Sequence, residues 1–512
     1  MRTNDLEFEY NERSDGYIYV NEDNLEEETK KILSAGHNVE RLEIGKEISR
    51  DAYLCLSQKR KNVLKWYPWD EDASLLEIGA GYGEFSDYLC KHLRKVMSYE
   101  RKAERLEVIK LRCREFENLQ CCTGNLEDLK FSEQYDYILV HDVFALARKF
   151  FKGKNPNVSM LNFLKQYLKE NGKLILVVEN RLGLKYFAGA AEDYSQQFFW
   201  GLKSFDEDER ARTFSKTELK EILQDSGFNS QKWFYPYPDA ICALEIYSDA
   251  IREKMIYGIS SPDYEYTSER FQFFDEQRMF YTLHKENMED KFVNAFFVEC
   301  SRNGHENNIA FANIENEICV TLSKDGFYVG EHRLPEGMRL DAYLAGLVQK
   351  VVNCNLGDKN PYIPKVYEVF ESIYSYLGND IYYLEDFYCL EGKVTPFFAE
   401  HEVEHTKDYY IWRIGYLWYL NNIMFYRNAK RRIRLEKIME ILHVESRKIP
   451  EYLSILEKEK KKTFMPRLSQ MMFDFEAENA KDGVLLDVDQ IGKETLVEKL
   501  AVLHGRTAGS GS

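Results

Sequence analysis

The feature that most constrains this chain is a glycine-rich loop between an apolar run and a helical pattern. Residues 75–83 read LLEIGAGYG, so Glu77 lies in the apolar run and Gly79, Gly81 and Gly83 follow at alternate positions. Glycine allows a tight backbone turn, and it lets a ligand approach the backbone with no Cβ in the way. The pattern therefore predicts a strand, a ligand-binding loop and a helix, in that order.

The spacing of these glycines differs from that of a dinucleotide-binding loop. The dinucleotide fingerprint places its third glycine one position later, where this chain has Glu84. A carboxylate there repels a pyrophosphate, which normally sits at a helix N-terminus. S-adenosylmethionine has no phosphate, and its cationic methionine end suits Glu77. The loop therefore predicts S-adenosylmethionine as the cofactor.

Two further positions fit the same cofactor. Glu100 ends the next predicted strand, 21 positions after Gly79, where an acidic side chain can accept hydrogen bonds from ribose hydroxyls. The third predicted strand leads into Asn125 and Leu126, where a polar group can meet the adenine edge. The alternative is that Glu77 and Glu100 are only solvated strand ends.

Short apolar runs alternate with helical patterns from Ser74 onward, which predicts a parallel sheet with helices on both faces. Strands are expected at residues 75–78, 96–99, 119–123, 137–140 and 174–178, and the segments 233–237 and 243–247 are expected to close the sheet. Helices are expected at residues 24–33, 51–66, 84–92, 101–114, 158–169 and 216–226.

The rest of the chain divides by its patterns. We predict a helical N-terminal segment (1–73), the α/β domain (74–250), a strand-rich accessory domain (251–400) with a hairpin at Lys324–Gly326, a helical C-terminal region (401–506), and the remnant of a tag (507–512, TAGSGS). The C-terminal half is therefore expected to be an α+β region. Its aromatic stretch 409–426 fits a core helix better than an amphipathic membrane helix.

Composition excludes several partners and locations. The formal net charge is −17, which disfavours nucleic acid as a partner. The ten cysteines include no CxxC pair, and the polar, acidic start predicts no signal peptide. No uncharged apolar run reaches the roughly 18 residues that span a bilayer. These features predict a cytoplasmic protein with reduced thiols and no transmembrane segment.

With these motifs in place, the sequence resembles the class I, Rossmann-like methyltransferases. Residues 77–83 match the first motif of that family, Glu100 matches its ribose-binding carboxylate, and residues 135–140 and 172–178 match its fourth and fifth strands. The resemblance implies a seven-stranded, mostly parallel sheet and an S-adenosylmethionine-dependent methyltransferase. It does not specify the acceptor.

A narrower resemblance concerns the segments 178–190, 212–215 and 235–239. They are similar to a bacterial subgroup found beside or fused to glycosyltransferases in surface-polysaccharide synthesis. This resemblance implies a polar small molecule or a glycan as acceptor and a glycosyltransferase as partner. The chain departs from the subgroup at Tyr194, where His is expected, at Ala240 and Ile241, where Tyr and Lys are expected, and over residues 141–145.

The candidate chemistry lies beyond the carboxyl ends of the strands, where ligands bind in such sheets. An alcohol acceptor needs a base within hydrogen-bond reach. His141 is the first candidate for that base, followed by Asp193 and Tyr194. The alternative for His141 is a structural or adenine-contacting residue. Asn180, Arg181 and Lys185 are predicted to bind the acceptor, with Arg181 and Lys185 as a clamp for an anion or as plain surface charges.

Two other functions are compatible with parts of the sequence. The departures at Tyr194 and Ala240 suggest a non-catalytic scaffold with a methyltransferase fold, but the intact cofactor motifs argue against it. His401, Glu402 and His405 fit the spacing of a zinc metallopeptidase. Zinc also needs a third protein ligand, and only Asp408 offers one between residues 406 and 435. A solvated acidic segment is favoured there, and no metal is predicted.

Overall fold

The computed structural model describes residues 24–42, 45–195, 197–202, 211–250, 274, 276–304, 307–314, 317–334, 337–378, 381–397, 404–423 and 432–461. The chain divides into two compact units. Unit 1 comprises Met1–Ile246 and Asp290–Asn307, and unit 2 comprises Tyr247–Glu289 and Asn308–Ser512. The segment that returns to unit 1 lies outside the predicted α/β range 74–250.

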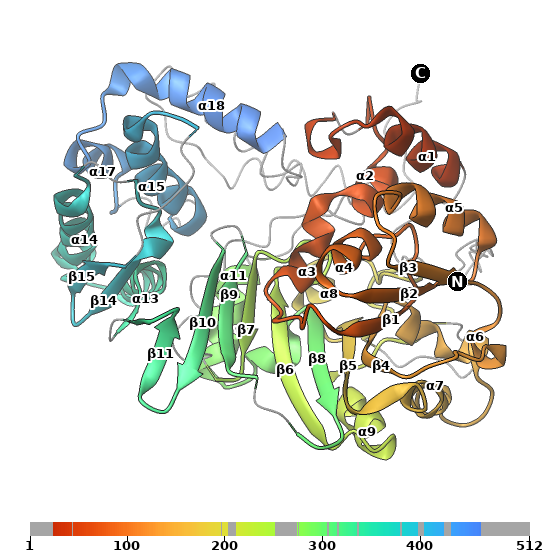
Figure 1. Ribbon diagram of the computed structural model, residues 1–512. Helices are drawn as coiled ribbons and strands as arrows, with labels where there is room; N and C mark the ends of the chain where they lie inside the picture. The colour runs from red at the N-terminus through yellow and green to blue at the C-terminus, as the bar shows by residue number, and fades with distance from the viewer. Residues whose placement is uncertain are drawn as a thin grey trace, which may run out of the picture. The chain divides into compact units, whose positions relative to one another are not determined.

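Unit 1 is built on a sheet whose strands lie in the order β6-β8-β5-β4-β1-β2-β3 (Figure 1). The bounds are β1 (Ser74–Ile78), β2 (Lys95–Tyr99), β3 (Leu119–Cys122), β4 (Tyr135–His141), β5 (Leu168–Glu179), β6 (Ser230–Tyr237) and β8 (Ala295–Ser301). β1 to β5 pair in parallel, whereas β8 is antiparallel to both β5 and β6. The predicted Rossmann-like, mostly parallel arrangement is confirmed for these strands, and the sheet continues beyond β6, so the predicted count of seven strands is not the full count.

The strand next to β5 adds one element to the prediction. The prediction that residues 243–247 join the sheet is confirmed, because β7 (Glu245–Ser248) lies beside β6. The strand that the sequence did not predict is β8, which lies between β5 and β6. β8 reads AFFVECS and is buried throughout. Because both faces of this strand are covered, its sequence does not show the alternation of a half-buried strand.

The helices of unit 1 alternate with its strands along the chain. Their bounds are α1 (Leu25–Ala35), α2 (Arg50–Leu56), α3 (Asn62–Lys65), α4 (Ser86–His92), α5 (Ala103–Arg112), α6 (Ala147–Phe150), α7 (Pro156–Lys165), α8 (Leu184–Phe187), α9 (Lys216–Asp225) and α12 (Glu289–Phe292). α1 packs against α5, and α7 packs against α9 (Figure 1). α7 ends before the predicted residue 169, because Leu168 already pairs with Tyr135 of β4.

The helix predicted over residues 51–66 is interrupted. α2 ends at Leu56, and a short helix η2 (Gln58–Lys61) separates it from α3. Ser57 leaves the helical conformation with ψ 138°, and its hydroxyl accepts a hydrogen bond from the N–H of Lys59 at 3.1 Å. Serine at such a position caps the following turn and competes with a continuous helix.

Unit 2 contains both strands and long helices. β9 (Ile309–Asn313), β10 (Ile318–Ser323), β11 (Gly326–Val329) and β12 (His332–Arg333) form an antiparallel ladder, and Ser323 pairs with Gly326 at the predicted hairpin. β13 (Met338–Arg339), β14 (Phe387–Leu390) and β15 (Lys393–Pro396) form a second sheet. The helices are α11 (Glu276–Lys285), α13 (Leu340–Asn353), α14 (Tyr362–Tyr376), α15 (Lys407–Asn422), α17 (Leu435–Ile441) and α18 (Ile449–Lys461).

Two helical features of unit 2 bear on the predictions. α13 and α14 lie in the range that was expected to be strand-rich. They are helical because their apolar residues recur at helical spacing and bury one face in the core of the unit. α15 is a core helix, as predicted. Its Trp412 and Tyr416 are buried and stack with ring centroids 4.6 Å apart. The predicted tag remnant lies outside the described residues.

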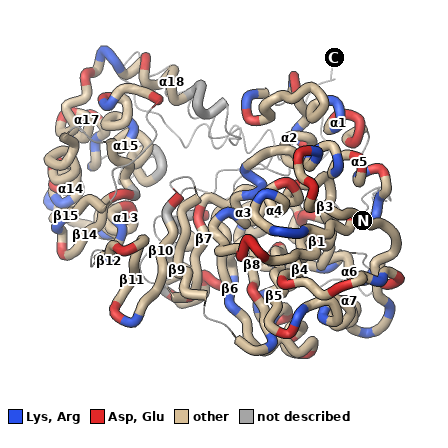
Figure 2. Tube along the Cα trace, viewed as in Figure 1, with Lys and Arg blue, Asp and Glu red and all other residues tan. Residues whose placement is uncertain are grey.

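Acidic and basic residues are intermixed along the traces of both units (Figure 2). All ten cysteines are free thiols. Within the described ranges, no helix combines the length and the apolarity needed to cross a membrane.

Candidate active site

The glycine loop after β1 has a conformation that requires glycine. Gly79, Gly81 and Gly83 have φ values of 87°, 59° and 76°, in the left-handed region that side chains with a Cβ rarely adopt. A Cβ on Gly79 would lie 3.1 Å from the Cβ of Val143 and 3.3 Å from the backbone oxygen of His141. The loop therefore packs tightly against the end of β4, and it has the bare backbone that the predicted cofactor requires.

Glu100 follows β2 and points back at the glycine loop. One carboxylate oxygen, Oε2, accepts a hydrogen bond from the N–H of Gly81 at 2.9 Å. The other, Oε1, accepts from the N–H of Lys102 at 3.1 Å and from Nη1 of Arg105 at 3.4 Å. Glu100 is thus a buried carboxylate fixed beside the loop, which does not fit the alternative of a solvated strand end.

Glu77 is fully buried beneath the loop, so it is not a solvated strand end either. Its Oε2 accepts hydrogen bonds from the hydroxyls of Ser86 at 2.7 Å and Ser98 at 2.6 Å. Its Oε1 lies 3.7 Å from Nε2 of His141. Among the described residues, neither this oxygen nor either ring nitrogen of His141 has a hydrogen-bond partner. The ends of β1 and β4 therefore hold unsatisfied polar atoms in the interior.

His141 lies between two carboxylates, since its Nδ1 is also 3.7 Å from Oδ2 of Asp142. Burial lowers the pKa of His141, but the carboxylates of Asp142 and Glu77 outweigh burial and raise that pKa to about 9. At neutral pH the imidazole then carries a proton and acts as a donor. This charge state does not favour the predicted role of His141 as a general base.

We expect the imidazole of His141 to titrate near pH 9 and to titrate lower in an Asp142→Asn variant. Because the folded-state pKa exceeds the ordinary value of 6.5, this group stabilises the fold fully below pH 6.5 and loses that contribution as the pH rises through 9. NMR of ¹³C-labelled histidine measures the titration directly. A pKa at or below 6.5 would instead restore His141 as a base.

Asp142 adopts a backbone conformation that is rare for a residue with a side chain, with φ 50° and ψ −48°. Such strain collects at functional sites. Its Oδ2 pairs with Nη2 of Arg60 at 3.4 Å, and its backbone oxygen accepts a hydrogen bond from the hydroxyl of Tyr194 at 2.9 Å. Tyr194 thus joins the segment after β5 to the end of β4.

The segment after β5 begins with residues that hold the fold together. Asn180 is fully buried, and its amide nitrogen donates to the backbone oxygens of Lys291 and Val293 at 2.8 and 2.7 Å. Arg181 pairs with Glu218 of α9 at 3.1 Å. Both predicted acceptor-binding side chains are therefore engaged within unit 1.

Lys185 is the centre of a buried ion cluster. Its Nζ lies 2.8 Å from Glu179, 3.1 Å from Asp193 and 3.6 Å from Asp239. Burial opposes the charge on Lys185, but the three carboxylates raise its pKa above the usual value, and burial raises the pKa of Glu179 to about 8. Each cation thus already has carboxylate partners, which does not favour the predicted role of Arg181 and Lys185 as a clamp for an anionic acceptor; that role stays a prediction.

Glu192 is a buried carboxylate with one anchored oxygen. Its Oε2 accepts hydrogen bonds from the N–H groups of Tyr194 at 3.1 Å and Ser195 at 2.7 Å. No described residue bonds to its Oε1. Burial and the neighbouring Asp193 raise the pKa of Glu192 to about 7. A carboxylate with this pKa suits proton transfer near neutral pH.

The predicted adenine-contacting segment follows β3. The side chain of Asn125 is exposed and donates to Asp128 at 3.3 Å, whereas Leu126 is fully buried. The hydroxyl of Tyr99 donates to the backbone oxygen of Gly124 at 2.9 Å, which ties this segment to the end of β2. The role of Asn125 and Leu126 toward adenine stays a prediction.

Two arginines of this region are not predicted by the sequence pattern. Arg60 lies in the run Lys-Arg-Lys at 59–61, which looks like a solvated charge run. Arg105 has the helical position of an ordinary surface charge. Both are buried and paired with carboxylates. The pairs Arg60–Asp142 and Arg105–Glu26 join segments far apart in the chain, which no local signal in the sequence shows.

The zinc alternative receives no support from the described residues. No group of three or more metal-binding side chains is found among them. His401 and Glu402 lie outside the described ranges. The ring of His405 lies against the ring of Tyr409, with centroids 5.0 Å apart.

The strand order and the glycine loop define the class of this domain, a Rossmann-like methyltransferase fold. Residues 49–232 match a family model described as a methyltransferase domain. Residues 49–232 therefore carry a methyltransferase domain, with S-adenosylmethionine as its cofactor. The predicted enzyme class and cofactor are confirmed. Residues 233–512 lie outside the matched range.

Solved structures with a similar fold are methyltransferases of low sequence identity. A SAM-dependent methyltransferase from Thermotoga maritima is 14% identical, with 55% of this chain and 100% of that chain covered and a TM-score of 0.29. The N-methyltransferase NodS from Bradyrhizobium japonicum is 14% identical, with 24% and 67% covered and a TM-score of 0.22. The CcbJ methyltransferase from Streptomyces caelestis is 17% identical, with 24% and 50% covered and a TM-score of 0.21. The chain thus spans only half of the last protein. No match is found among curated proteins.

Proposed function

We propose that this enzyme transfers a methyl group from S-adenosylmethionine to a hydroxyl or amine of a polar small molecule or glycan. The single observation that carries the proposal is the hydrogen bond from Tyr194 to the backbone of Asp142. It brings the segment after β5 to the end of β4, beside the glycine loop. The acceptor is thereby expected at the carboxyl edge of the sheet, where ligands bind in such folds.

The cofactor is proposed to lie on the bare backbone of Gly79, Gly81 and Gly83, with its ribose on Glu100. The positive φ values of the glycines and the burial of Glu100 beside Gly81 support this placement. The bound cofactor supplies a methyl group on a positively charged sulfur. The chain's own residues hold the two reactants in line and exclude water.

The carboxyl groups at the carboxyl edge of the sheet restrict the chemical class of the acceptor. Glu179, Glu192 and Asp193 are buried there and Asp142 is half-buried, and Lys185 is shared among three carboxylates. The free carboxyl oxygens at this edge accept hydrogen bonds, which hydroxyl and amine groups donate and an anionic oxygen does not. We therefore propose a neutral or cationic acceptor.

Glu192 is proposed as the group that takes the acceptor's proton. Its Oε2 is held by two backbone N–H groups, so the carboxylate cannot turn freely, and its Oε1 has no partner among the described residues. His141 is a weaker candidate because it is protonated at neutral pH. Tyr194 and Asp193 are proposed to position this segment, since both bond to its neighbours.

We expect Glu100→Ala to weaken binding of S-adenosylhomocysteine by about 1–3 kcal/mol, the scale for losing hydrogen bonds to a charged group. Isothermal titration calorimetry measures this change. Glu104→Ala, at an exposed position of α5, serves as the control and should leave the affinity within a few tenths of a kcal/mol. Equal affinities of the two variants would place Glu100 outside the cofactor site.

We expect Glu192→Gln to lower kcat by about 10²-fold while the affinity for the cofactor stays unchanged, because only proton transfer is lost. Glu170→Gln, at an exposed position of β5, is the control and should keep full turnover. Loss of cofactor binding in Glu192→Gln would show that this segment holds the cofactor and not the acceptor.

The acceptor itself is found by incubating the enzyme with labelled S-adenosylmethionine and a host extract. Label in a glycan or in a polar small molecule supports the proposal. The resemblance to the glycosyltransferase-associated subgroup makes polysaccharide precursors the first purified candidates, and a glycosyltransferase the first candidate partner. Binding of the cofactor with no transfer to any fraction would favour the non-catalytic scaffold.

A further inference from the structure

A buried charge cluster joins the N-terminal helix to the glycine loop. Arg105 of α5 is 1% exposed, and its Nη1 lies 3.4 Å from Oε1 of Glu100. Its Nε lies 3.7 Å from Oε1 of Glu26, in the first turn of α1. The same oxygen of Glu26 accepts a hydrogen bond from the hydroxyl of Tyr82 at 3.0 Å. Residues from α1, from the glycine loop and from the end of β2 thus meet at one guanidinium.

Tyr82 completes the enclosure of this guanidinium. It stands between two of the loop glycines and is fully buried, and the guanidinium of Arg105 lies 4.9 Å from the centre of its ring. A buried arginine needs paired charges and an adapted surrounding, because an uncompensated charge is costly in the interior. Here the loop supplies the ring, and Glu26 and Glu100 supply the charges.

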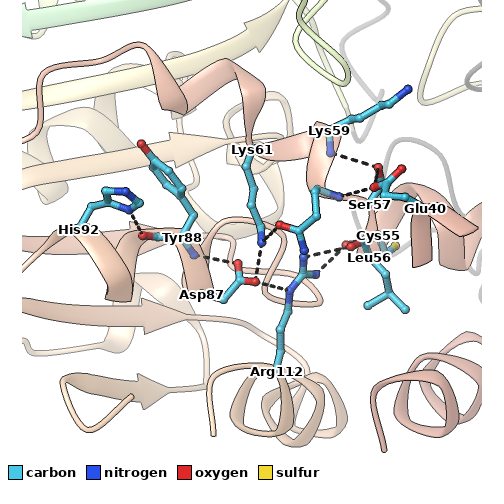
Figure 3. Close-up of polar contacts among 11 residues, drawn as sticks. Glu40, Cys55, Leu56, Ser57, Lys59, Lys61, Asp87, Tyr88, His92 and Arg112 are labelled. Atoms are coloured by element: carbon cyan, nitrogen blue, oxygen red, sulfur yellow. Dashed lines mark hydrogen bonds and ion pairs between the residues drawn. The ribbon is translucent and has the colours of Figure 1, made fainter. Parts of the chain in front are cut away.

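The N-terminal segment is also held by contacts that do not involve Glu26. Figure 3 shows Arg112 of α5 donating to the backbone oxygens of Cys55 and Leu56 and pairing with Asp87, which also binds Lys61. Apolar side chains of α1 and α2 form a common core with Tyr82. Substitution of Glu26 or Arg105 therefore leaves other anchors of this segment in place.

We propose that Arg105 is a positioning residue for the Glu100 carboxylate and that α1, through Glu26, is part of the cofactor site. The inference rests on the proposed ribose contact of Glu100. A carboxylate that accepts hydrogen bonds from two ribose hydroxyls must keep one orientation. Glu100 is held in place because one of its oxygens accepts from the N–H of Gly81 and the other from Arg105. Fixing a binding group in advance lowers the entropy lost when the ligand binds.

The experiment is a double-mutant cycle in the full chain, read by calorimetry with S-adenosylhomocysteine and with its 2′-deoxyribose analogue. We expect Arg105→Met to weaken S-adenosylhomocysteine binding about tenfold and to reduce the preference for the ribose form. The double variant with Glu100→Ala should bind no more weakly than Glu100→Ala alone, because Arg105 acts through that carboxylate. Arg105→Lys should restore part of the affinity.

The control is Arg112→Met on the same helix, which removes another buried guanidinium but no contact to Glu100. It should lower the melting temperature and keep the preference for the ribose form. Additive losses in the cycle, or an unchanged preference in Arg105→Met, would overturn the proposal. If Glu100→Ala itself has no effect while the wild type binds the cofactor, the ribose assignment fails instead. If Arg105→Met does not fold, the same double-mutant cycle is measured with Arg105→Lys and with Glu26→Gln in its place.

The role of α1 has its own readout. We expect amide hydrogen exchange in α1 to slow when S-adenosylhomocysteine binds, and to respond much less in Glu26→Gln. If amide exchange in α1 of the wild type does not change when the cofactor binds, α1 is not part of the cofactor site. The double-mutant cycle then tests only the role of Arg105.

Discussion

Gly81→Val is expected to abolish binding of S-adenosylmethionine and S-adenosylhomocysteine. Gly81 has φ 59°, which a β-branched residue adopts only with strain, and its N–H donates to Glu100. The added side chain also fills the bare backbone on which the cofactor is proposed to lie. Calorimetry should detect no binding at concentrations that saturate the wild type.

A matched control separates this effect from backbone strain. Gly330 has a similar φ of 55° and is exposed, and a Cβ at this position would meet no atom within 4 Å. Gly330→Val in unit 2 therefore introduces comparable strain without touching the loop, and it should bind the cofactor normally. Undiminished affinity in a folded Gly81→Val variant would falsify the assignment of the cofactor site.

Lys185→Met is expected to destabilise unit 1 by about 3–5 kcal/mol, because it leaves Glu179, Asp193 and Asp239 buried without their cation. Methionine keeps much of the length of the side chain and removes the charge. The free energy of unfolding falls by this amount because removal of one partner leaves the remaining buried charges uncompensated. Hydrogen exchange in β4 and β5, followed with increasing urea, measures the loss for unit 1.

The loss should depend on pH in a defined direction. Without Lys185 the folded-state pKa values of Glu179 and Asp193 rise further above their unfolded values, and burial already raises that of Glu179 to about 8. Such groups contribute stability at low pH and lose it as the pH rises through the folded-state pKa. The deficit of Lys185→Met should therefore be smallest near pH 5 and largest above pH 8.

Lys169→Met provides the control for this prediction. Lys169 also pairs with a carboxylate, Asp136 at 2.8 Å, but the two side chains are 45% and 33% exposed. An exposed pair contributes about 0–1 kcal/mol, so this variant should lose at most that amount. Equal losses for Lys169→Met and Lys185→Met would show that the buried cluster does not stabilise unit 1.

Much of unit 1 was predictable because its signals are local. The strands β1, β2 and β4 each combine an apolar run with a turn or a helix pattern, and the glycine spacing alone distinguishes the loop from a dinucleotide-binding one. β8 was not predicted because a strand covered on both faces lacks alternation, and because a long insertion separates it from β6 in the chain. Helices α13 and α14 were not predicted because the hairpin turn at Gly326 and the nearby β-branched residues favour strands.

The sequence by itself determined the class of the sheet, the loop, the cofactor and the position of Glu100 after the second strand, since each depends on neighbouring residues and on fixed spacing. Only the tertiary structure decided what the charged residues do. Lys185 became a buried counter-ion, His141 an imidazole whose pKa is raised by two neighbouring carboxylates, and Arg105 a contact of Glu100. Each of these states depends on burial and on the three-dimensional arrangement of the charged groups, because pKa values and ion pairs respond to the surrounding charges, whether their owners are near or far along the chain.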